Sequence, residues 1–274
     1  QPCACRGSAK FIHKACLERW RRMSPKADAA YRCGQCGDRY RDALSLELLS
    51  ARLQAQRTNG GNLSFILHTL ASELKAQGKY DEAEPLYREV LELDREVLGN
   101  RHHNTLTCVN NLGGLLYDKG DLTAAEPLYR EVMEVSRETL GNRHPDTLTS
   151  INNLGLLLMA KGDLAAAEPL CREALEVQRE TLGSRHPNTL TSVNNLGALL
   201  HDKGDRAAAE LLYREAVGVQ RETLGNRHPS TLGFINNLAL LLQDKGDFAA
   251  AEPLLREAMG VHRETLGDRH PSTL

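Results

Sequence analysis

The sequence has 274 residues, of which 41% are apolar, enough to bury a core, but only 4% are aromatic. A core with so few large rings must be built from Leu, Ala and Val, which excludes an all-β fold and favours packed helices. No window reaches 18 consecutive apolar residues and the N-terminus lacks a signal-peptide pattern, so we expect a cytoplasmic protein with no membrane segment in this stretch.

Charge and cysteine are unevenly distributed along the chain. Residues 1–57 carry 12 Lys/Arg against 5 Asp/Glu, whereas the rest carries 22 against 31, a division hidden by the net charge of −2. Five of the seven cysteines lie within the first 36 residues. Such clustering without a secretory signal indicates metal binding rather than disulfides. Nothing indicates a nucleotide loop, a catalytic triad or a nucleic-acid patch, so we expect no nucleic-acid partner.

The basic N-terminal part, residues 1–40, contains three closely spaced pairs of thiolate or imidazole ligands. Such pairs at these intervals are typical of zinc sites, and zinc takes four ligands, so six ligands leave one site incomplete. The pairs are Cys3-x-Cys5, His13-x2-Cys16 and Cys33-x2-Cys36.

The segments from Pro2 to Ser8 and from Ile12 to Trp20, with the last cysteine pair, resemble the later three-quarters of the RING-CH domain of membrane-associated RING-CH ubiquitin ligases. The resemblance implies two zinc ions as cofactors in a cross-brace, with a further C-x2-C pair ahead of Gln1. It also implies a ubiquitin-conjugating enzyme as partner, whose thioester the module positions without covalent catalysis. In this mapping one zinc site is complete and the other is half present: Cys3, Cys5, Cys33 and Cys36 form the first, and His13 and Cys16 belong to the second.

Trp20 matches the aromatic residue that contacts the conjugating enzyme in RING domains. The alternative is a ring packed inside the zinc-bound core, because tryptophan serves both cores and interfaces. Residues 41–61 follow as a connection, with leucines at helical spacing that Thr58–Gly61 interrupts. We expect a connecting helix that packs on the first repeat; its leucines are Leu44, Leu48, Leu49 and Leu53.

The rest of the chain is a repeat. Leu-Gly pairs recur every 42 residues from Leu98-Gly99 to Leu266-Gly267, which defines five units over 62–271 and the start of a sixth at 272–274. Each unit contains two amphipathic stretches, so we predict two helices per repeat. Because the chain begins without methionine and stops inside the repeat pattern, we also expect a fragment.

Polar residues and glycines at fixed phases predict where these helices begin and end. Six side chains are expected to cap the first helices: Asn62, Asn104, Asp146, Asn188, Ser230 and Ser272. Five glycines are expected to end them: Gly78, Gly120, Gly162, Gly204 and Gly246. Four aspartates are expected to cap the second helices: Asp121, Asp163, Asp205 and Asp247.

The recurring Asn-Asn-Leu-Gly-x-Leu-Leu-x-x-Lys-Gly-Asp-x-x-x-Ala-Glu pattern resembles the tetratricopeptide repeat, in particular the 42-residue variety of kinesin light chain. The matching positions include Leu154, Gly155 and Ala167. The resemblance covers about three-quarters of the chain. It implies an all-α, right-handed solenoid of helix pairs, with a concave groove, lined by the first helices, that binds extended peptides.

At 100° per residue, one asparagine per repeat lies opposite the core stripe of the first helix. A row of carboxamides can pair with the backbone of a peptide ligand, although these side chains can also satisfy neighbouring helices. The row consists of Asn111, Asn153, Asn195 and Asn237, with Thr69 in the first unit. The preceding asparagines are expected to be structural: Asn110, Asn152, Asn194 and Asn236.

Two further expectations concern charge and metal on the repeats. Three aspartates at one end of this face, without basic residues beside them, should disfavour acidic peptides. The histidines that recur at 102, 144, 186, 228 and 270 should form rigid loops, since packed helices hold them too far apart to share a zinc ion. The aspartates are Asp118, Asp202 and Asp244.

Together these features predict a zinc-dependent RING-CH-type ubiquitin ligase whose solenoid recruits a substrate or partner peptide. The rival is a non-catalytic scaffold for protein interaction in which the zinc module is structural. An artefactual fusion of the two parts is the third alternative.

Overall fold

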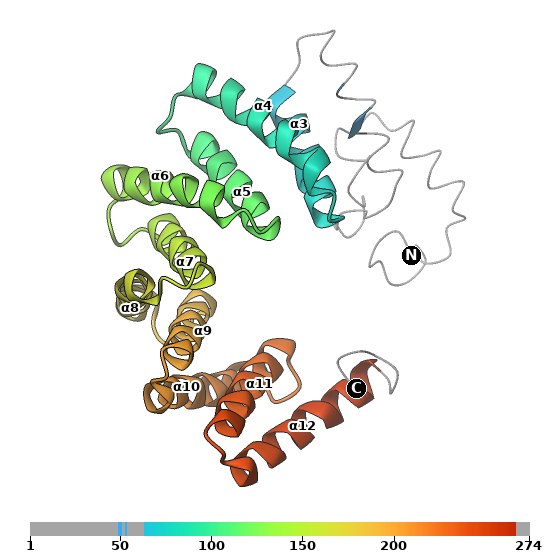
Figure 1. The fold of residues 1–274 in the computed structure, drawn as a ribbon, viewed down its shortest axis with the longest axis vertical. Coiled ribbons are helices and arrows are strands. Elements are labelled where there is room, and N and C mark those ends of the chain that lie inside the picture. The colour runs from blue at the N-terminus through green and yellow to red at the C-terminus, as the bar shows by residue number, and fades with distance from the viewer. Residues whose placement is uncertain (1–48, 51–52, 54–62, 267–274) are drawn as a thin grey trace, which may run out of the picture. The chain divides into compact units, whose positions relative to one another are not determined.

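The structure, a computed structural model, describes residues 49–50, 53 and 63–266 (Figure 1). Every regular element in these ranges is an α-helix, which confirms the predicted all-α fold. A helix of 14 or 16 residues alternates with one of 19 residues, so each 42-residue unit forms one helix pair. The helices are α3 (Leu63–Ala76), α4 (Tyr80–Leu98), α5 (His103–Asp118), α6 (Leu122–Leu140), α7 (Pro145–Ala160), α8 (Leu164–Leu182), α9 (Pro187–Asp202), α10 (Arg206–Leu224), α11 (Pro229–Asp244) and α12 (Phe248–Leu266).

Contacts divide the chain into two units whose boundary lies within α6, between Leu128 and Tyr129. In the first unit, α4 packs against both α3 and α5. In the second unit, α7 packs on α8, α8 on α9, α9 on α10, α10 on α11 and α11 on α12. Within each unit, a second helix therefore touches its own first helix and that of the next repeat, the nearest-neighbour stacking of a solenoid.

The core is built from the residues that the 42-residue pattern placed there. In the third repeat, Leu148, Ile151 and Leu154 of α7 are fully buried, as are Ala167 and Cys171 of α8. The side chains are mainly aliphatic, as the scarcity of aromatics requires. Neither helix can bury this stripe alone, which is why the repeats must stack.

Close packing between the two helices of a repeat explains why a glycine stands within α7 and within α9. A Cβ on Gly155 would lie 2.9 Å from Cys171 Sγ, and one on Gly197 would lie 2.7 Å from Cε1 of Tyr213. Real Cβ atoms essentially never come so close, so the facing side chain occupies the space that glycine leaves.

The predicted ends of the first helices and starts of the second helices are confirmed. The five predicted glycines, from Gly78 to Gly246, have φ between 74° and 86°, the left-handed region that other residues avoid. Capping of the second helices by aspartate is also as predicted, with the backbone N–H three residues on donating to the carboxylate at 3.0 to 3.1 Å. These aspartates are Asp121, Asp163, Asp205 and Asp247.

The predicted caps of the first helices are wrong by two residues wherever the structure describes the cap. His186 is the N-cap of α9, and its Nδ1 accepts a hydrogen bond from Asn188 N–H at 3.1 Å. Pro187 then occupies the first helical position, where its missing N–H costs nothing. The predicted capping residue is thus the donor rather than the acceptor, and the other histidine caps are His102, His144 and His228.

A buried threonine of the following helix bonds to the loop before His102, His186 and His228, whereas Thr147 Oγ1 in the third repeat has no partner, and the rigidity of these loops stays a prediction. Thr189 Oγ1 donates to Gly183 O at 2.9 Å, and Thr231 Oγ1 donates to Gly225 O at 2.8 Å. Both glycines have positive φ. The Leu-Gly pair therefore marks a hydrogen-bonded turn between repeats.

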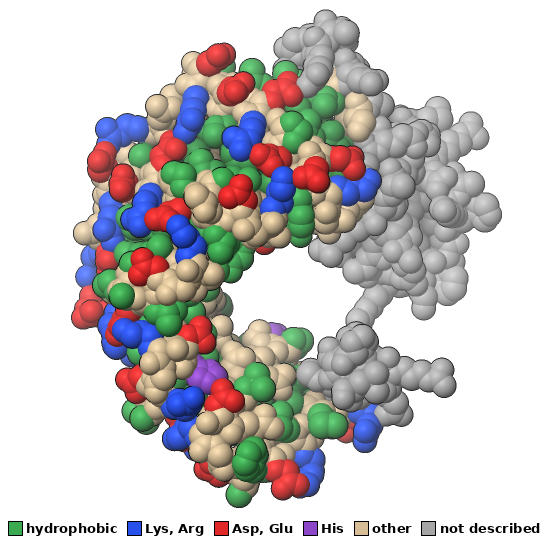
Figure 2. All heavy atoms as spheres, viewed as in Figure 1, with side chains coloured by type: hydrophobic (Ala, Val, Ile, Leu, Met, Phe, Trp, Pro, Cys, Tyr) green, Lys and Arg blue, Asp and Glu red, His purple; other side chains and the backbone are tan. Residues whose placement is uncertain are grey.

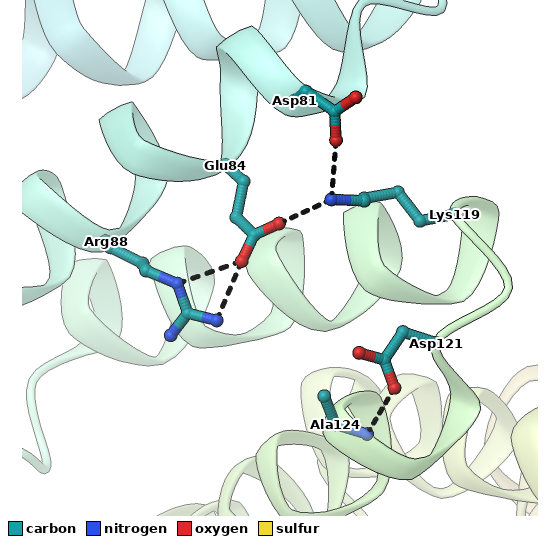
Figure 3. Close-up of polar contacts among 6 residues, drawn as sticks. All are labelled: Asp81, Glu84, Arg88, Lys119, Asp121 and Ala124. Atoms are coloured by element: carbon teal, nitrogen blue, oxygen red, sulfur yellow. Dashed lines mark hydrogen bonds and ion pairs between the residues drawn. The ribbon is translucent and has the colours of Figure 1, made fainter.

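An ion-pair cluster joins neighbouring repeats in both units. Glu84 of α4 accepts hydrogen bonds from Lys119, at the end of α5, at 2.7 Å and from Arg88 at 2.8 Å (Figure 3). The Lys119 ammonium, and then Arg88, hold the pKa of the Glu84 carboxyl below its usual value. The same arrangement recurs twice in the second unit, as Glu168 with Lys203 and Arg172 and as Glu210 with Lys245 and Arg214.

Three further observations concern the connecting segment, the surface and the hydrophobicity of the described helices. Leu49 and Leu53, within the predicted connecting helix, are helical and buried. On the face shown in Figure 2, basic and acidic side chains are interspersed over the described helices. Among the described helices, none has the length and hydrophobicity needed to cross a bilayer.

Candidate partner-binding surface of the repeats

The face predicted to be open for a ligand is largely exposed. In the third repeat Thr149 and Ala160 are exposed, while Asn153 and Leu156 are half-buried. The predicted helix phase is therefore correct there. The face runs along the first helix of the repeat, on the side opposite the core stripe.

The asparagine row is not a set of equivalent side chains. Asn111 Nδ2 lies 2.7 Å from His68 Nε2, and Asn237 Nδ2 donates to Asn194 Oδ1 at 2.6 Å. Both contacts join residues 43 positions apart, because each of these asparagines lies next to the first helix of the preceding repeat. Part of each carboxamide is therefore engaged between repeats.

Asn195 differs from the expectation of an open face, since it is only 5% exposed and its Nδ2 has no hydrogen-bond partner. The role of Asn111, Asn153, Asn195 and Asn237 in peptide binding stays a prediction.

The adjacent asparagine of the third repeat is structural, as predicted. Asn152 is buried, and its Nδ2 donates to Ser192 Oγ at 2.8 Å. Ser192 in turn lies within hydrogen-bonding distance of Asn152 Oδ1 and of Gln178 Oε1, at 3.1 and 2.6 Å. This cluster, the Asn152–Gln178–Ser192 network, binds α7, α8 and α9 together.

One repeat later the corresponding positions form a pocket instead of a closed network. Its volume is about 630 Å³, and it lies between α9, α10 and α11. Gln220, the equivalent of Gln178, is 5% exposed, and its Oε1 has no hydrogen-bond partner. Asn194, Phe234 and Asn237 also line the pocket, so Asn194 belongs to this surface rather than to a closed interior.

The expectation that the acidic end of this face lacks basic residues is wrong. Lys75 Nζ lies 3.1 Å from Asp118 Oδ2, and His201 Nε2 lies 2.7 Å from Asp244 Oδ2. Lys75 and His201 both belong to the first helix of the preceding repeat. The spacing of residues within one repeat does not reveal such a contact. Asp202 is exposed.

None of the described residues form a cluster of three or more side chains that could hold a metal ion. Burial raises the pKa of the Cys108 thiol to about 12 and that of the Cys171 thiol to about 11, so both stay protonated at neutral pH. The predicted zinc ligands and Trp20 all lie outside the described residues: Cys3, Cys5, His13, Cys16, Cys33 and Cys36.

The pocket residues Gln220 and Phe234 were not found by pattern reasoning, which concentrated on what the repeats share. The sequence signal is weak, because the two positions concerned vary from repeat to repeat. The pairs Thr149-Ser150 and Thr191-Ser192 become Gly233-Phe234 in the fifth repeat. The first two repeats differ at the same positions, with Phe65-Ile66 and Thr107-Cys108, so the change in the fifth repeat does not by itself mark a site.

The stacked helix pairs are those of a repeat solenoid, and matches to known sequence families define the same class of protein. A tetratricopeptide repeat model matches residues 62–138, 108–158 and 146–222, and a second matches 231–272. The chain belongs to the tetratricopeptide repeat family.

Residues 1–36 match a RING-variant domain. Over 42 residues the chain is 45% identical to the E3 ubiquitin-protein ligase MARCHF5 of Danio rerio and 43% identical to that of Xenopus laevis. These matches cover 15% of this chain and 14 to 15% of each relative, so the chain spans about one-seventh of the length of the curated relatives it matches.

Among solved structures, the nearly identical TPR-like repeats of a kinesin light chain from Podosopora anserina superpose with a TM-score of 0.64 and 26% identity, over 78% of this chain and 97% of that chain. BtubC from P. vanneervenii has the same fold, with a TM-score of 0.64 and 22% identity over 82% and 89% of the two chains. The chain thus combines a RING-variant segment with repeats of the kinesin light chain type.

Proposed function

We propose that this chain is part of a cytoplasmic, zinc-dependent RING-CH-type ubiquitin ligase whose repeats recruit the substrate or partner to be modified. The observation that carries the proposal is the union, in one chain, of a RING-variant segment and a repeat array with an open side-chain surface. A RING-type module accelerates transfer by proximity, so a second module that holds the target supplies what the first one lacks.

The donor set of the RING-variant segment fits zinc. Four cysteines in two close pairs supply the thiolates of a tetrahedral site, and the His13 and Cys16 pair supplies two donors of a second site. When bound, zinc would hold the segment in its folded form rather than take part in a reaction step. The thiols of the described repeats, by contrast, are buried and protonated. The four cysteines of the first site are Cys3, Cys5, Cys33 and Cys36.

In this proposal Trp20 contacts the ubiquitin-conjugating enzyme. Tryptophan is enriched at the centre of interfaces, where it buries a large area at small entropic cost. The RING-variant match over residues 1–36, which include Trp20, supports this role.

The repeats supply the recruiting surface, because their first helices present polar side chains that are only partly engaged with neighbouring repeats. Asn111, Asn153 and Asn237 are each half-buried, and in this proposal the exposed part of their side chains pairs with a peptide backbone. A scaffold without ligase activity would use the same surface, so recruitment alone does not distinguish the two functions.

Ubiquitin transfer does distinguish them. We expect the 274-residue chain to be inactive or nearly so in an autoubiquitination assay, since one zinc site has only two ligands here. A version extended ahead of Gln1 by a C-x2-C loop should transfer ubiquitin and should lose activity on Trp20→Ala. If the extended version holds two zinc ions yet transfers no ubiquitin with any of a broad panel of conjugating enzymes, the scaffold function is correct.

A further inference from the structure

Lysine is scarce in the repeats, and its scarcity limits where they can be modified. Of the 22 basic residues that follow Arg57, six are lysines and the rest are arginines. The distinction matters to a ubiquitin ligase, because only an amine that can lose its proton attacks an acyl group, whereas arginine stays charged. All six lysines lie within the described residues. The candidate acceptors are Lys75, Lys79, Lys119, Lys161, Lys203 and Lys245.

Four of the six lysines recur at one phase, directly before the glycine that ends the first helix. At three of them the structure shows carboxylates of the preceding repeat holding the amine. Lys119 Nζ donates to Glu84 Oε2 at 2.7 Å and lies 2.8 Å from Asp81 Oδ1 (Figure 3). The equivalent pairs of the second unit are Lys203 with Glu168 and Lys245 with Glu210.

At Lys119 the carboxylates also make the amine a poorer nucleophile. Asp81, and then Glu84, raise the pKa of the Lys119 amine above its usual value, so the neutral form that attacks an acyl group is scarcer. Lys75 Nζ lies 3.1 Å from Asp118 Oδ2, and Lys161 is not free either. Five of the six amines are therefore engaged before any acyl donor arrives.

Lys79 is the exception. Its Nζ lies 3.9 Å from Oε1 of Glu82, and 45% of its side chain is exposed. A contact of this length between exposed side chains three residues apart contributes almost nothing. The side chains of four other lysines are 25 to 35% exposed: Lys75, Lys119, Lys203 and Lys245.

The position of Lys79 in the repeat is unusual as well. It is the N-cap of α4, and its side chain makes no capping hydrogen bond. The equivalent residue of each later repeat is an aspartate that caps the second helix. A cation at this end of a helix also faces the positive pole of the helix dipole. The first repeat therefore forgoes a stabilising cap and carries an accessible amine instead.

We propose that Lys79 is the residue of the repeats to which the ligase attaches ubiquitin when it modifies itself, and that the contacts of the other lysines protect them. The inference rests on the ligase function proposed above and deepens it by naming the site of self-modification.

The transfer needs no reactant beyond the ubiquitin thioester carried by the conjugating enzyme. After its ammonium loses a proton to water, Lys79 Nζ attacks the carbonyl carbon of the thioester. A nitrogen–carbon bond forms and the carbon–sulfur bond breaks, so ubiquitin passes to Lys79 as an amide. The sulfur leaves as a thiolate, which takes up the second proton that the nitrogen releases.

The reactivity of the lysines can be tested without ubiquitin. The 274-residue chain is treated with a trace of the N-hydroxysuccinimide ester of acetic acid, and mass spectrometry compares the rates at which the six lysines are acetylated. We expect Lys79 to react fastest. Glu168→Gln, which frees Lys203, should raise the rate at Lys203 by about 2- to 5-fold, the span of an exposed ion pair. The matched Glu82→Gln should leave the rate at Lys79 unchanged.

The second measurement uses the version extended ahead of Gln1 by a C-x2-C loop, with activating enzyme, conjugating enzyme and ubiquitin. Mass spectrometry of the digested product locates the attached ubiquitin, and we expect Lys79 to carry most of what is attached to the repeats. Lys79→Arg should remove this ubiquitin while it keeps the charge. Lys79→Asp should remove it too and should raise the melting temperature, because it restores the cap found in later repeats.

Two outcomes would overturn the inference. One is acetylation of Lys203 or Lys245 in the original chain as fast as that of Lys79. The other is transfer of ubiquitin to other residues while Lys79 receives none. Absence of all transfer would contradict the ligase function itself, and the inference with it, so the two failures are distinguishable.

Discussion

Single atoms decide how closely the two helices of a repeat approach. Gly197 of α9 faces the ring of Tyr213 of α10, and a methyl group there has no room. Gly218, also in a helix, faces open space. The two glycines therefore provide a direct comparison between a glycine required by packing and one that is not.

We predict opposite effects of alanine at these two positions. Gly197→Ala should lower the free energy of unfolding by about 1 to 3 kcal/mol, because the added Cβ forces the Tyr213 ring or the backbone to shift. Gly218→Ala should raise it by about 0.4 to 1 kcal/mol through the lower entropy of the unfolded chain. Urea denaturation measures both, and a common sign would contradict the packing argument.

The corrected helix cap makes a second prediction at this scale. His186→Ala removes the acceptor for Asn188 N–H and should cost about 0.5 to 2 kcal/mol, as for other N-caps. Asn188→Ala leaves that hydrogen bond intact, since only its backbone takes part, and should change stability by less than about 0.5 kcal/mol. Thermal unfolding of both variants tests this, and the reverse order would restore the cap that the sequence pattern first indicated.

At the scale of whole elements, much of the structure could be predicted from sequence. The two helices per repeat, their aspartate caps and their glycine ends all follow from local chemistry that recurs every 42 residues. The histidine cap was missed because the sequence pattern assigned capping to Asn, Asp and Ser side chains, whereas the imidazole two residues earlier accepts the bond, even at His102, where no proline follows. Contacts such as Asn237 with Asn194 and Lys75 with Asp118 were missed because they depend on the distance between repeats, which no single repeat encodes.

The ion-pair clusters between repeats give a pH-dependent prediction. Hydrogen bonds from Lys203, and then Arg172, lower the pKa of Glu168 from its ordinary value of 4.5. A lowered native pKa stabilises the fold fully above about pH 4.5, and that contribution is lost as the pH falls through the native value. Because the pair is partly exposed, Glu168→Gln should cost less than about 1 kcal/mol at pH 7, and the difference should shrink below about pH 4.5.

Urea denaturation at several pH values, with the original chain and Glu168→Gln side by side, checks this. Added salt should also reduce the difference at pH 7, since solvent ions screen a pair that they can reach. A difference that stays constant down to acidic pH would show that Glu168 acts through packing rather than through its charge.

At the scale of the whole molecule, the N-terminal segment should bind zinc and the repeats should not. We expect one tightly bound zinc ion per chain, measured by elemental analysis, and its loss on Cys33→Ser. Cys108→Ala and Cys171→Ala should leave the zinc content unchanged, because both thiols are buried and protonated in the repeats. A chain prepared with ample zinc that holds none would refute the assignment of the N-terminal segment.

The central claim is that one part transfers ubiquitin and the other chooses the target, and a single reaction tests the two together. A reporter protein carries either a peptide selected on the repeats from a random display library or its scrambled form. It is incubated with the chain extended by a C-x2-C loop, together with activating enzyme, conjugating enzyme and ubiquitin. We predict ubiquitin on the reporter with the selected peptide and none on the scrambled reporter, with excess free peptide blocking reporter modification but not autoubiquitination. Equal modification of both reporters, or none of either while autoubiquitination proceeds, would contradict the account.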